Sequence, residues 1–291
     1  MLKLCLHLTK PCMPIPTMTT APTTAPTTAP TKPATADSPR RSWPKAILFD
    51  LDDTLWPIVP VIIAAEQKLH AWLQIHAPRV AERFSIDSLR QARLALLASQ
   101  PALEVDLHAL RRAGLLSAFQ EVGEDEAKID LAMLHFAAAR NAVTTYDDVL
   151  PGLARLKERA LLGSISNGNA DLQAIGLSHH FKVSVAAHHF GSAKPDPAIF
   201  LAACAELGVD PQDAVYVGDD VLLDVRGAQQ AGLRAVWLNR NGSEAHLEHG
   251  VVPDAICRDF HELLDWLERE HEHRNEDGHE HGHGRPADGA P

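Results

Sequence analysis

The sequence predicts an α/β protein with a Rossmann-like, doubly wound parallel sheet and an inserted helical cap domain. Apolar runs that end in polar residues alternate with helical stretches over 45–56 and 149–268, which is the pattern of strands buried on both faces of a parallel sheet. Residues 57–148 contain amphipathic helical patterns without a strand between them. They are therefore expected to form a cap inserted after the first strand.

Five short apolar runs are the predicted strands of the catalytic core: 46–49, 161–165, 183–186, 214–217 and 235–238. Helices are expected between them, where apolar residues recur at helical spacing or Pro opens and Gly closes the segment: 150–160, 197–207 and 221–231. Polar residues at the carboxyl ends of parallel strands line the ligand crevice of such a sheet. The strand ends should therefore hold the functional residues.

The cap is expected to consist of four amphipathic helices, at 62–75, 89–97, 107–119 and 126–141. A lid over the crevice is its natural role, because closure excludes water from the chemistry; a helical decoration is the alternative. Four polar residues of the cap are candidate substrate contacts, although polar residues on an amphipathic helix are more often solvated: Asp106, His108, Arg111 and Arg112.

Both ends of the chain differ from the middle in composition. Residues 1–44 contain a Thr/Ala/Pro repeat in which recurring Pro disfavours helix and sheet, so a disordered leader is expected. Residues 269–291 hold five His among Glu, Asp and Gly, which predicts a disordered tail. This tail is either a binder of divalent metals or a solvated segment of low complexity.

The composition limits the classes of binding partner and the compartment that we expect for this protein. The net charge of −11 disfavours nucleic acid and anionic membranes as partners, so an anionic substrate would require local positive charge, for example from a divalent cation. No apolar run approaches the roughly 20 residues of a membrane span. The four Cys include no close pair, which fits a reducing compartment, and we expect a cytoplasmic protein. The sequence does not indicate an oligomeric state.

The sequence DLDDTL at 50–55 carries the first chemical signal. Asp50 and Asp52 are two residues apart after a predicted strand, so both side chains can face the crevice while Leu51 packs away from it. One carboxylate can attack a phosphoryl group, and the other can protonate the leaving oxygen and later activate water. The alternative is that these aspartates only cap a turn.

Three further strand ends complete the pattern. Ser166 and the amides of Asn167 and Gly168 are candidate donors to phosphoryl oxygens. Lys194, before Pro-Asp-Pro, offers a positive charge to the nucleophile and the phosphate. Three acids follow the fourth run, a grouping of like charges that favours a bound Mg²⁺: Asp219, Asp220 and Asp224.

These four motifs, FDLDDTL, SNG, Lys194 before Pro-Asp-Pro, and VGDDVLLDV, resemble in order and spacing those of haloacid dehalogenase superfamily phosphatases with a helical cap. The resemblance covers about Lys45 to Asn239. It implies that Asp50 is the nucleophile and Asp52 the general acid and base. It further implies that Ser166 and Lys194 stabilise the phosphate and the intermediate. The implied direct Mg²⁺ ligands are Asp50, the carbonyl of Asp52 and Asp219. One acid of the pair Asp220 and Asp224 is expected to act on the metal site through water or without direct contact.

The implied function is Mg²⁺-dependent hydrolysis of a small phosphate monoester through an aspartyl phosphate. Asp52 favours ester cleavage over dehalogenation, because a leaving alkoxide must be protonated. The segments ISNGNADLQAIGL and VGDDVLLDVRGAQQAGLRAVW resemble the branch that acts on FMN and 5-amino-6-(5-phospho-D-ribitylamino)uracil. The alternatives are a nucleotidase, a phosphoglycolate-type phosphatase, a phosphomutase, a 2-haloacid dehalogenase and a metal-binding protein that acts through its His-rich tail.

Overall fold

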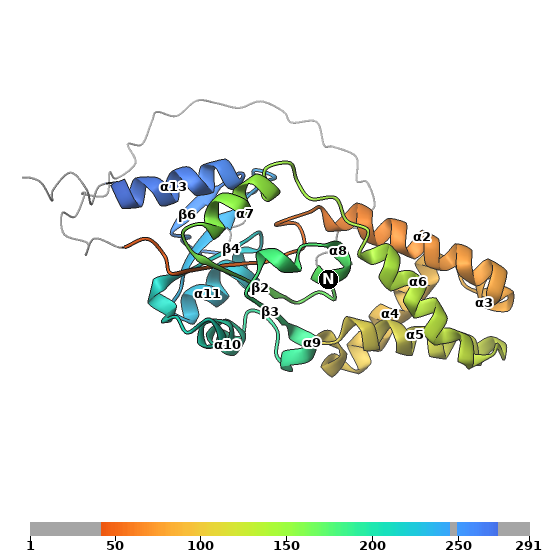
Figure 1. The fold of residues 1–291 in the computed structure, drawn as a ribbon. Coiled ribbons are helices and arrows are strands. Elements are labelled where there is room, and N and C mark those ends of the chain that lie inside the picture. Colours follow the sequence, from red (N-terminus) through yellow and green to blue (C-terminus); the bar gives the residue numbers. More distant parts are fainter. Residues whose placement is uncertain (1–41, 245–248, 273–291) are drawn as a thin grey trace, which may run out of the picture. The chain divides into compact units, whose positions relative to one another are not determined.

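The computed structural model describes residues 42–244 and 249–272 of the chain, and a six-stranded parallel sheet forms the centre of this part (Figure 1). The strands are β1 (Ala46–Phe49), β2 (Leu161–Ser166), β3 (Val183–Ala186), β4 (Ala214–Gly218), β5 (Arg234–Leu238) and β6 (Ala255–Cys257). Their order across the sheet is β3-β2-β1-β4-β5-β6. The chain winds outward in both directions from β1 and β4, and ligand crevices form at the carboxyl ends of strands at such a switch point. The predicted doubly wound parallel sheet is confirmed.

The two faces of the sheet are covered by different helices. On one face, Ala46 and Leu48 of β1 belong to a core cluster with α10 (Pro197–Leu207) and α11 (Gly227–Gln230). On the other face, Ile47 and Phe49 pack in a cluster with α7 (Val149–Lys157) and α13 (Phe260–Glu272). Figure 1 shows these helix pairs on opposite sides of the strands. Because β1 is buried on both faces, its sequence is a continuous apolar run.

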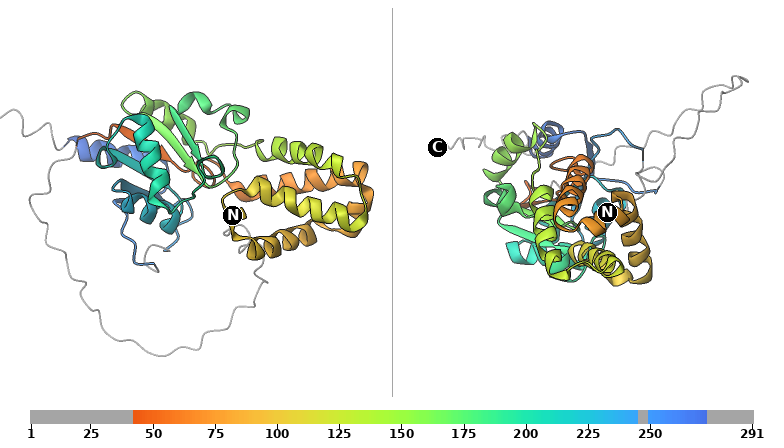
Figure 2. Two further views of the ribbon diagram at one scale, coloured as in Figure 1. Left: turned by 90° about the horizontal axis from the view of Figure 1, so that it is seen from below. Right: turned by 90° about the vertical axis from the view of Figure 1, so that its right-hand side faces the viewer.

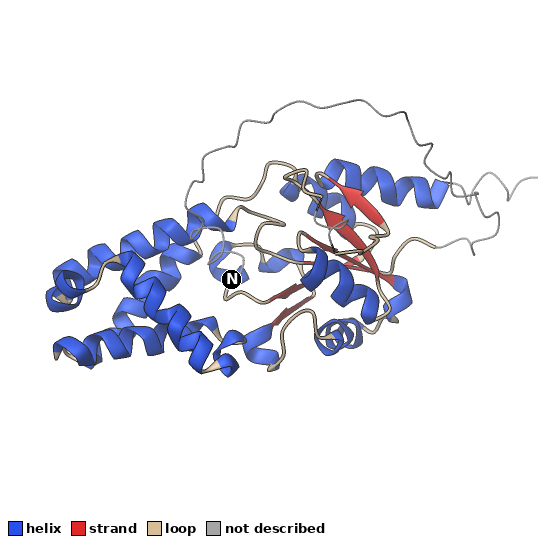
Figure 3. Ribbon diagram, turned by 180° about the vertical axis from the view of Figure 1, so that it is seen from behind, coloured by secondary structure: helices blue, strands red, loops and turns tan. Residues whose placement is uncertain are grey.

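The predicted helical cap is confirmed as an insertion between β1 and α7. It contains α2 (Ile58–His76), α3 (Pro78–Arg83), α4 (Ile86–Ser99), η1 (Pro101–Glu104), α5 (Leu107–Val122), η2 (Glu126–Lys128) and α6 (Ile129–Arg140). Figures 2 and 3 show that these helices gather beside the sheet and contain no strand.

A buried carboxylate holds three cap helices together. Glu66 of α2 is 5% exposed and pairs with Arg90 and Arg93 of α4, and Arg111 of α5 lies 3.6 Å from it. Burial alone would raise the pKa of Glu66, but the three guanidinium groups outweigh it and lower the pKa. The cap therefore has its own polar core.

Arg240, two residues after the end of β5, fixes the segments that join cap and core. Its guanidinium pairs with both carboxylate oxygens of Asp148 at 3.1 and 3.0 Å, and its Nε donates to the Thr54 carbonyl at 3.1 Å. The guanidinium also lies 4.0 Å from the centre of the Tyr146 ring. One side chain of the core thus contacts both linkers to the cap.

The structure differs from the sequence predictions at several short elements. The sequence did not predict β6, α3, α13 or the short helices α8 (Leu172–Ile175), α9 (Ala187–Phe190), η3 (Ser178–His180) and η4 (Pro211–Asp213). The helix expected over 221–231 divides into the π-helix η5 (Val221–Arg226) and α11. Apart from α13, which spans 13 residues, these elements are shorter than the window of about 11 residues over which helical periodicity can be recognised.

The structure also describes residues at both predicted ends of the core. Trp43, placed in the leader by the sequence, packs against the core with the Arg159 guanidinium 3.4 Å from its ring centre. Helix α13 runs four residues past the predicted end of the core at 268. Residues 1–41 of the leader and 273–291 of the His-rich tail lie outside the described residues. No helix within 42–244 or 249–272 combines the length and apolarity that a bilayer span requires.

Candidate active site

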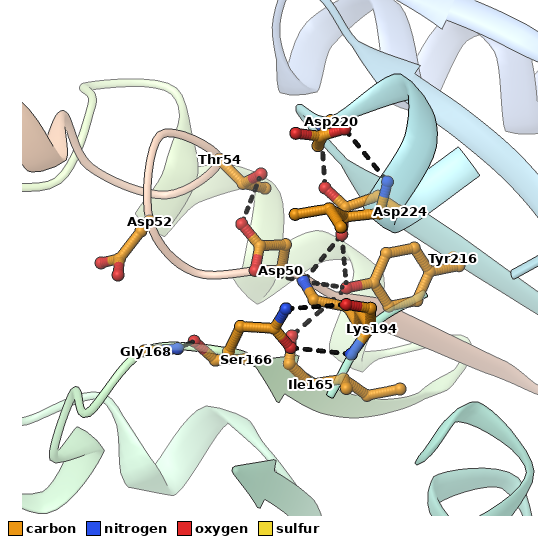
Figure 4. Close-up of polar contacts among 12 residues, drawn as sticks. Asp50, Asp52, Thr54, Ile165, Ser166, Gly168, Lys194, Tyr216, Asp220 and Asp224 are labelled. Carbon is orange, nitrogen blue, oxygen red and sulfur yellow. Dashed lines mark hydrogen bonds and ion pairs between the residues drawn. The ribbon is translucent and has the colours of Figure 1, made fainter. Parts of the chain in front are cut away.

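A buried cluster of charged side chains lies at the carboxyl ends of β1 and β4 (Figure 4). Asp50 follows β1 and is 7% exposed. The Nζ atom of Lys194 donates to Asp50 Oδ1 at 2.6 Å and to Asp224 Oδ1 at 2.7 Å. Residues predicted separately from three strand ends are therefore in direct contact.

Tyr216 completes the surroundings of Lys194. Its hydroxyl accepts a hydrogen bond from Lys194 Nζ at 2.9 Å and lies 3.2 Å from both the Ile165 carbonyl and Asp224 Oδ1. Burial by itself lowers the pKa of Lys194, but the carboxylates of Asp224 and Asp50 outweigh it and raise the pKa. Lys194 is thus held as a cation with three acceptors.

The same cluster concentrates negative charge. One oxygen each from Asp50, Asp219 and Asp224 lies within 4.8 Å of the others. Burial raises the pKa of Asp50 well above its ordinary value; Lys194 opposes this shift, and Asp224 and Asp219 add to it. Oxygen donors at this spacing suit a hard divalent cation, which would offset the repulsion between the carboxylates.

Asp220 has a different environment from Asp224. Its Oδ1 accepts from the amides of Leu222 and Leu223 at 2.8 and 3.0 Å, so Asp220 caps the first turn of η5. Asp224 Oδ2 accepts from the Asp220 amide at 2.9 Å. Of the two acids that the sequence left open, Asp224 is the one whose carboxylate joins Asp50 and Asp219.

Asp52 lies apart from the Lys194 cluster, and Figure 4 shows its carboxylate pointing away from Asp50. The Nη2 atom of Arg140, in the last turn of α6, lies 2.7 Å from both Asp52 oxygens. Trp56 Nε1 donates to Asp52 Oδ1 at 2.9 Å. The carboxylate predicted to act as acid and base is thus held by one core residue and one cap residue.

Asp53 has the capping role that the sequence analysis gave as the alternative for this motif. It has a positive φ of 65°, and its Oδ1 accepts from the Ile58 amide at 2.9 Å at the start of α2. The tight turn that directs the chain from β1 into the cap therefore uses Asp53 and leaves Asp50 and Asp52 available.

The Ser-Asn-Gly segment after β2 combines a hydroxyl group with a close backbone approach. Ser166 is 4% exposed, and its Oγ accepts from the Gly168 amide at 2.9 Å. The Asn167 side chain makes two hydrogen bonds to the backbone of Lys194, at 2.9 and 3.0 Å. Asn167 therefore fixes the loop that carries Lys194, and its side-chain amide is committed to that contact.

The sequence analysis missed four residues of the site: Thr54, Trp56, Arg140 and Tyr216. Thr54 is buried and donates to Asp50 Oδ2 at 3.4 Å. Trp56 and Tyr216 read as core residues in the sequence, because the hydrogen-bonding atom of a buried aromatic side chain leaves no pattern. Arg140 is one basic residue at the end of a cap helix, and no spacing links it to Asp52.

Three of the four candidate cap contacts are engaged within the cap. Asp106 caps α5 by accepting from the Ala109 amide at 2.9 Å, and exposed Arg112 donates to Asp130 at 3.1 Å. Arg111 is buried, with its guanidinium 3.6 Å from the centre of the Phe136 ring. His108 is exposed.

Comparison with known proteins gives consistent matches over this region. The model of the haloacid dehalogenase-like hydrolase family matches residues 44–232. The 5-amino-6-(5-phospho-D-ribitylamino)uracil phosphatase of Escherichia coli is 30% identical over 66% of this chain and 82% of its own. The glyceraldehyde 3-phosphate phosphatase of Methanopyrus kandleri is 32% identical over 76% and 96%. A solved structure described as a 2-haloacid dehalogenase from Pseudomonas syringae is 37% identical, covers 77% and 98% of the two chains, and has a TM-score of 0.72.

Proposed function

This chain belongs to the haloacid dehalogenase-like hydrolase family, and we propose that it is a Mg²⁺-dependent phosphatase that cleaves small phosphate monoesters through a phosphorylated Asp50. The observation that carries the proposal is the buried contact of Asp50 with Lys194, beside the carboxylates of Asp219 and Asp224. Phosphoryl transfer requires positioning and charge stabilisation of this kind.

The carboxylates fit a magnesium ion by their chemistry, since hard oxygen ligands at this spacing are what Mg²⁺ binds. Asp50, Asp219 and Asp224 would hold it, together with the Asp52 carbonyl that the family resemblance implies. Bound Mg²⁺ would withdraw negative charge from the phosphoryl oxygens and permit an anionic ester to approach an anionic nucleophile.

The residues of the chain account for both halves of the reaction. Lys194 supplies positive charge beside the phosphoryl oxygens, and the Ser166 hydroxyl and the backbone amide of Asn167 donate hydrogen bonds to them. The Asp50 carboxylate attacks phosphorus, the bond to the ester oxygen breaks, and Asp52 gives its proton to the leaving alkoxide. Asp52 then takes a proton from water, whose oxygen attacks the phosphorus of the aspartyl phosphate. Inorganic phosphate leaves and Asp50 is regenerated.

We further propose that the substrate is a phosphorylated metabolite such as FMN or 5-amino-6-(5-phospho-D-ribitylamino)uracil, on the strength of the similarity to the Escherichia coli phosphatase. Nucleoside monophosphates and phosphoglycolate are the alternatives from the sequence, and the Methanopyrus kandleri relative adds glyceraldehyde 3-phosphate. These esters form the substrate panel for the test below. The two Cys of the described residues, Cys204 and Cys257, are buried free thiols, which supports a cytoplasmic enzyme.

A dehalogenase is the second candidate, because of the similarity to the Pseudomonas syringae structure. The presence of Asp52 argues against dehalogenation, because a departing alkoxide needs a proton and a departing halide does not. The two functions therefore differ in whether Asp52 is required.

The test is turnover by the purified full chain with Mg²⁺. We expect phosphate release from the panel and from 4-nitrophenyl phosphate, its loss on adding EDTA, and its loss in Asp50→Asn. Asp130→Asn, an exposed acid of the cap, is the matched control and should retain full activity. Halide release from 2-chloropropionate without phosphate release would overturn the proposal, as would full activity of Asp50→Asn.

A further inference from the structure

Arg140 links the cap to the reacting end of the core. It lies in the last turn of α6, is 5% exposed, and reaches Asp52 in the loop after β1. We propose that Arg140 is a positioning residue for the reaction, which holds the Asp52 carboxylate where it can transfer a proton to the leaving group. This inference rests on the proposed phosphatase function.

The position of Asp52 is defined from three sides. Arg140 Nη2 lies 2.7 Å from each Asp52 oxygen, and Trp56 Nε1 donates to Oδ1 at 2.9 Å. A Cβ atom added to Gly168 would lie 2.6 Å from Asp52 Oδ2, 3.3 Å from Ser166 Oγ and 3.4 Å from Arg140 Nη2. The carboxylate is therefore held against the loop that binds phosphoryl oxygens in the proposed mechanism.

This position suits a proton donor to the leaving oxygen. In a phosphoryl transfer, the attacking and leaving oxygens lie roughly in line on opposite sides of phosphorus. The Asp50 side chain is 9% exposed and that of Asp52 is 23% exposed, so Asp52 is nearer to solvent than the nucleophile. A substrate that enters from solvent presents phosphorus to Asp50 and leaves its ester oxygen on the outer side, where Asp52 lies.

A purely structural ion pair between cap and core is the competing explanation for Arg140. The fold already has such a pair in Arg240 and Asp148, in which two guanidinium nitrogens bind two carboxylate oxygens. Arg140 uses only Nη2 on Asp52, and its Nη1 is buried without a hydrogen bond among the described residues. A purely structural pair predicts equal losses in leaving-group release from every substrate when Arg140 is replaced, whereas a role through Asp52 predicts a loss that depends on the leaving group.

The test compares two leaving groups in Arg140→Met. 4-Nitrophenolate departs without a proton, whereas the alkoxide of an alkyl phosphate needs one, so only the alkyl ester depends on Asp52 as an acid. We expect the single-turnover rate of leaving-group release to fall about 10- to 100-fold for the best alkyl ester of the panel and less than about threefold for 4-nitrophenyl phosphate. Hydrolysis of the aspartyl phosphate uses Asp52 as a base with either ester, so that step should slow to the same extent for both. Arg140→Lys, which keeps the charge but not the planar fork, should give an intermediate loss.

A double variant separates positioning from stability. If Arg140 acts through Asp52, Asp52→Asn combined with Arg140→Met loses no more alkyl esterase activity than Asp52→Asn alone. Arg83→Met, which removes an exposed cap arginine paired with Glu121, is the matched control and should change neither substrate.

Each outcome has a defined consequence. Equal losses in the rate of leaving-group release from both substrates, multiplicative losses in the double variant, or faster release of the alkyl leaving group in Arg140→Met would each overturn the inference. An inactive wild-type chain would instead refute the proposed function, so the two failures are distinguishable. Circular dichroism at the assay temperature shows whether each variant is folded, and Arg140→Lys replaces Arg140→Met if the latter is not.

Discussion

Replacing Lys194 by Met should destabilise the protein strongly and in a pH-dependent way. The substitution keeps the length and apolar stem of the side chain but removes the cation between Asp50 and Asp224. Both carboxylates are buried, and they accept from Lys194 at 2.6 and 2.7 Å. The folded variant must therefore bury an unpaired carboxylate or take up a proton.

The size of the destabilisation follows from the free energy needed to protonate one carboxylate. Protonating one carboxyl of ordinary pKa costs about 4 kcal/mol at neutral pH, at about 1.4 kcal/mol per pH unit. This agrees with the about 3–5 kcal/mol that removal of one partner from a buried ion pair costs. By the same calculation, the loss shrinks to about 1.5 kcal/mol near pH 5.

The assay is urea unfolding of the full chain with EDTA present, near pH 7 and near pH 5. Lys45→Met is the matched control, because Lys45 pairs with Asp213 at the same 2.7 Å but its side chain is 64% exposed. We expect no measurable change in this control, since solvent screens an exposed pair. Wild-type stability of Lys194→Met at pH 7, or a loss that does not shrink near pH 5, would refute the reasoning.

Three further predictions concern the same site. Gly168→Ala should leave the fold intact but slow alkyl ester hydrolysis roughly 10- to 100-fold, because the added Cβ would lie 2.6 Å from Asp52 Oδ2. Thermal unfolding checks the stability of this variant, and steady-state kinetics checks its activity. Asp220→Ala should lower the free energy of unfolding in urea by about 1 kcal/mol, because it removes a helix cap, and the variant should retain activity. Complete inactivity of this variant would instead indicate that Asp220 is a metal ligand. Because the folded state raises the pKa of Asp50, its protonated form stabilises the metal-free fold at low pH, and this contribution is lost as the pH rises through the raised value. The stability of the wild type relative to Asp50→Asn in EDTA should therefore fall as the pH rises above about 4, the ordinary range of an Asp carboxyl, and a rise with pH would contradict the prediction.

The sequence could place Asp50, the Ser166 segment and Asp219 at one edge of the sheet, because their position is a local property of the chain. Asp50, Ser166 and Asp219 directly follow or end apolar runs, and a run of four or five β-branched or aliphatic residues between helical segments predicts a parallel strand. The carboxyl ends of parallel strands lie along one edge of the sheet. Chain order thus placed these residues near one another without any knowledge of distance.

The partners of those residues depend on contacts between segments far apart in the chain. In the sequence, nothing distinguishes Asp220 from Asp224, because both are aspartates of the same segment. In the fold, the turn of η5 after β4 lets Asp220 cap its own helix and places Asp224 against Lys194. Arg140 meets Asp52 across 88 positions because the cap returns to the core at that point. Periodicity describes which face of an element is buried, whereas these contacts require the packing of one element on another, and the fold alone supplies that packing.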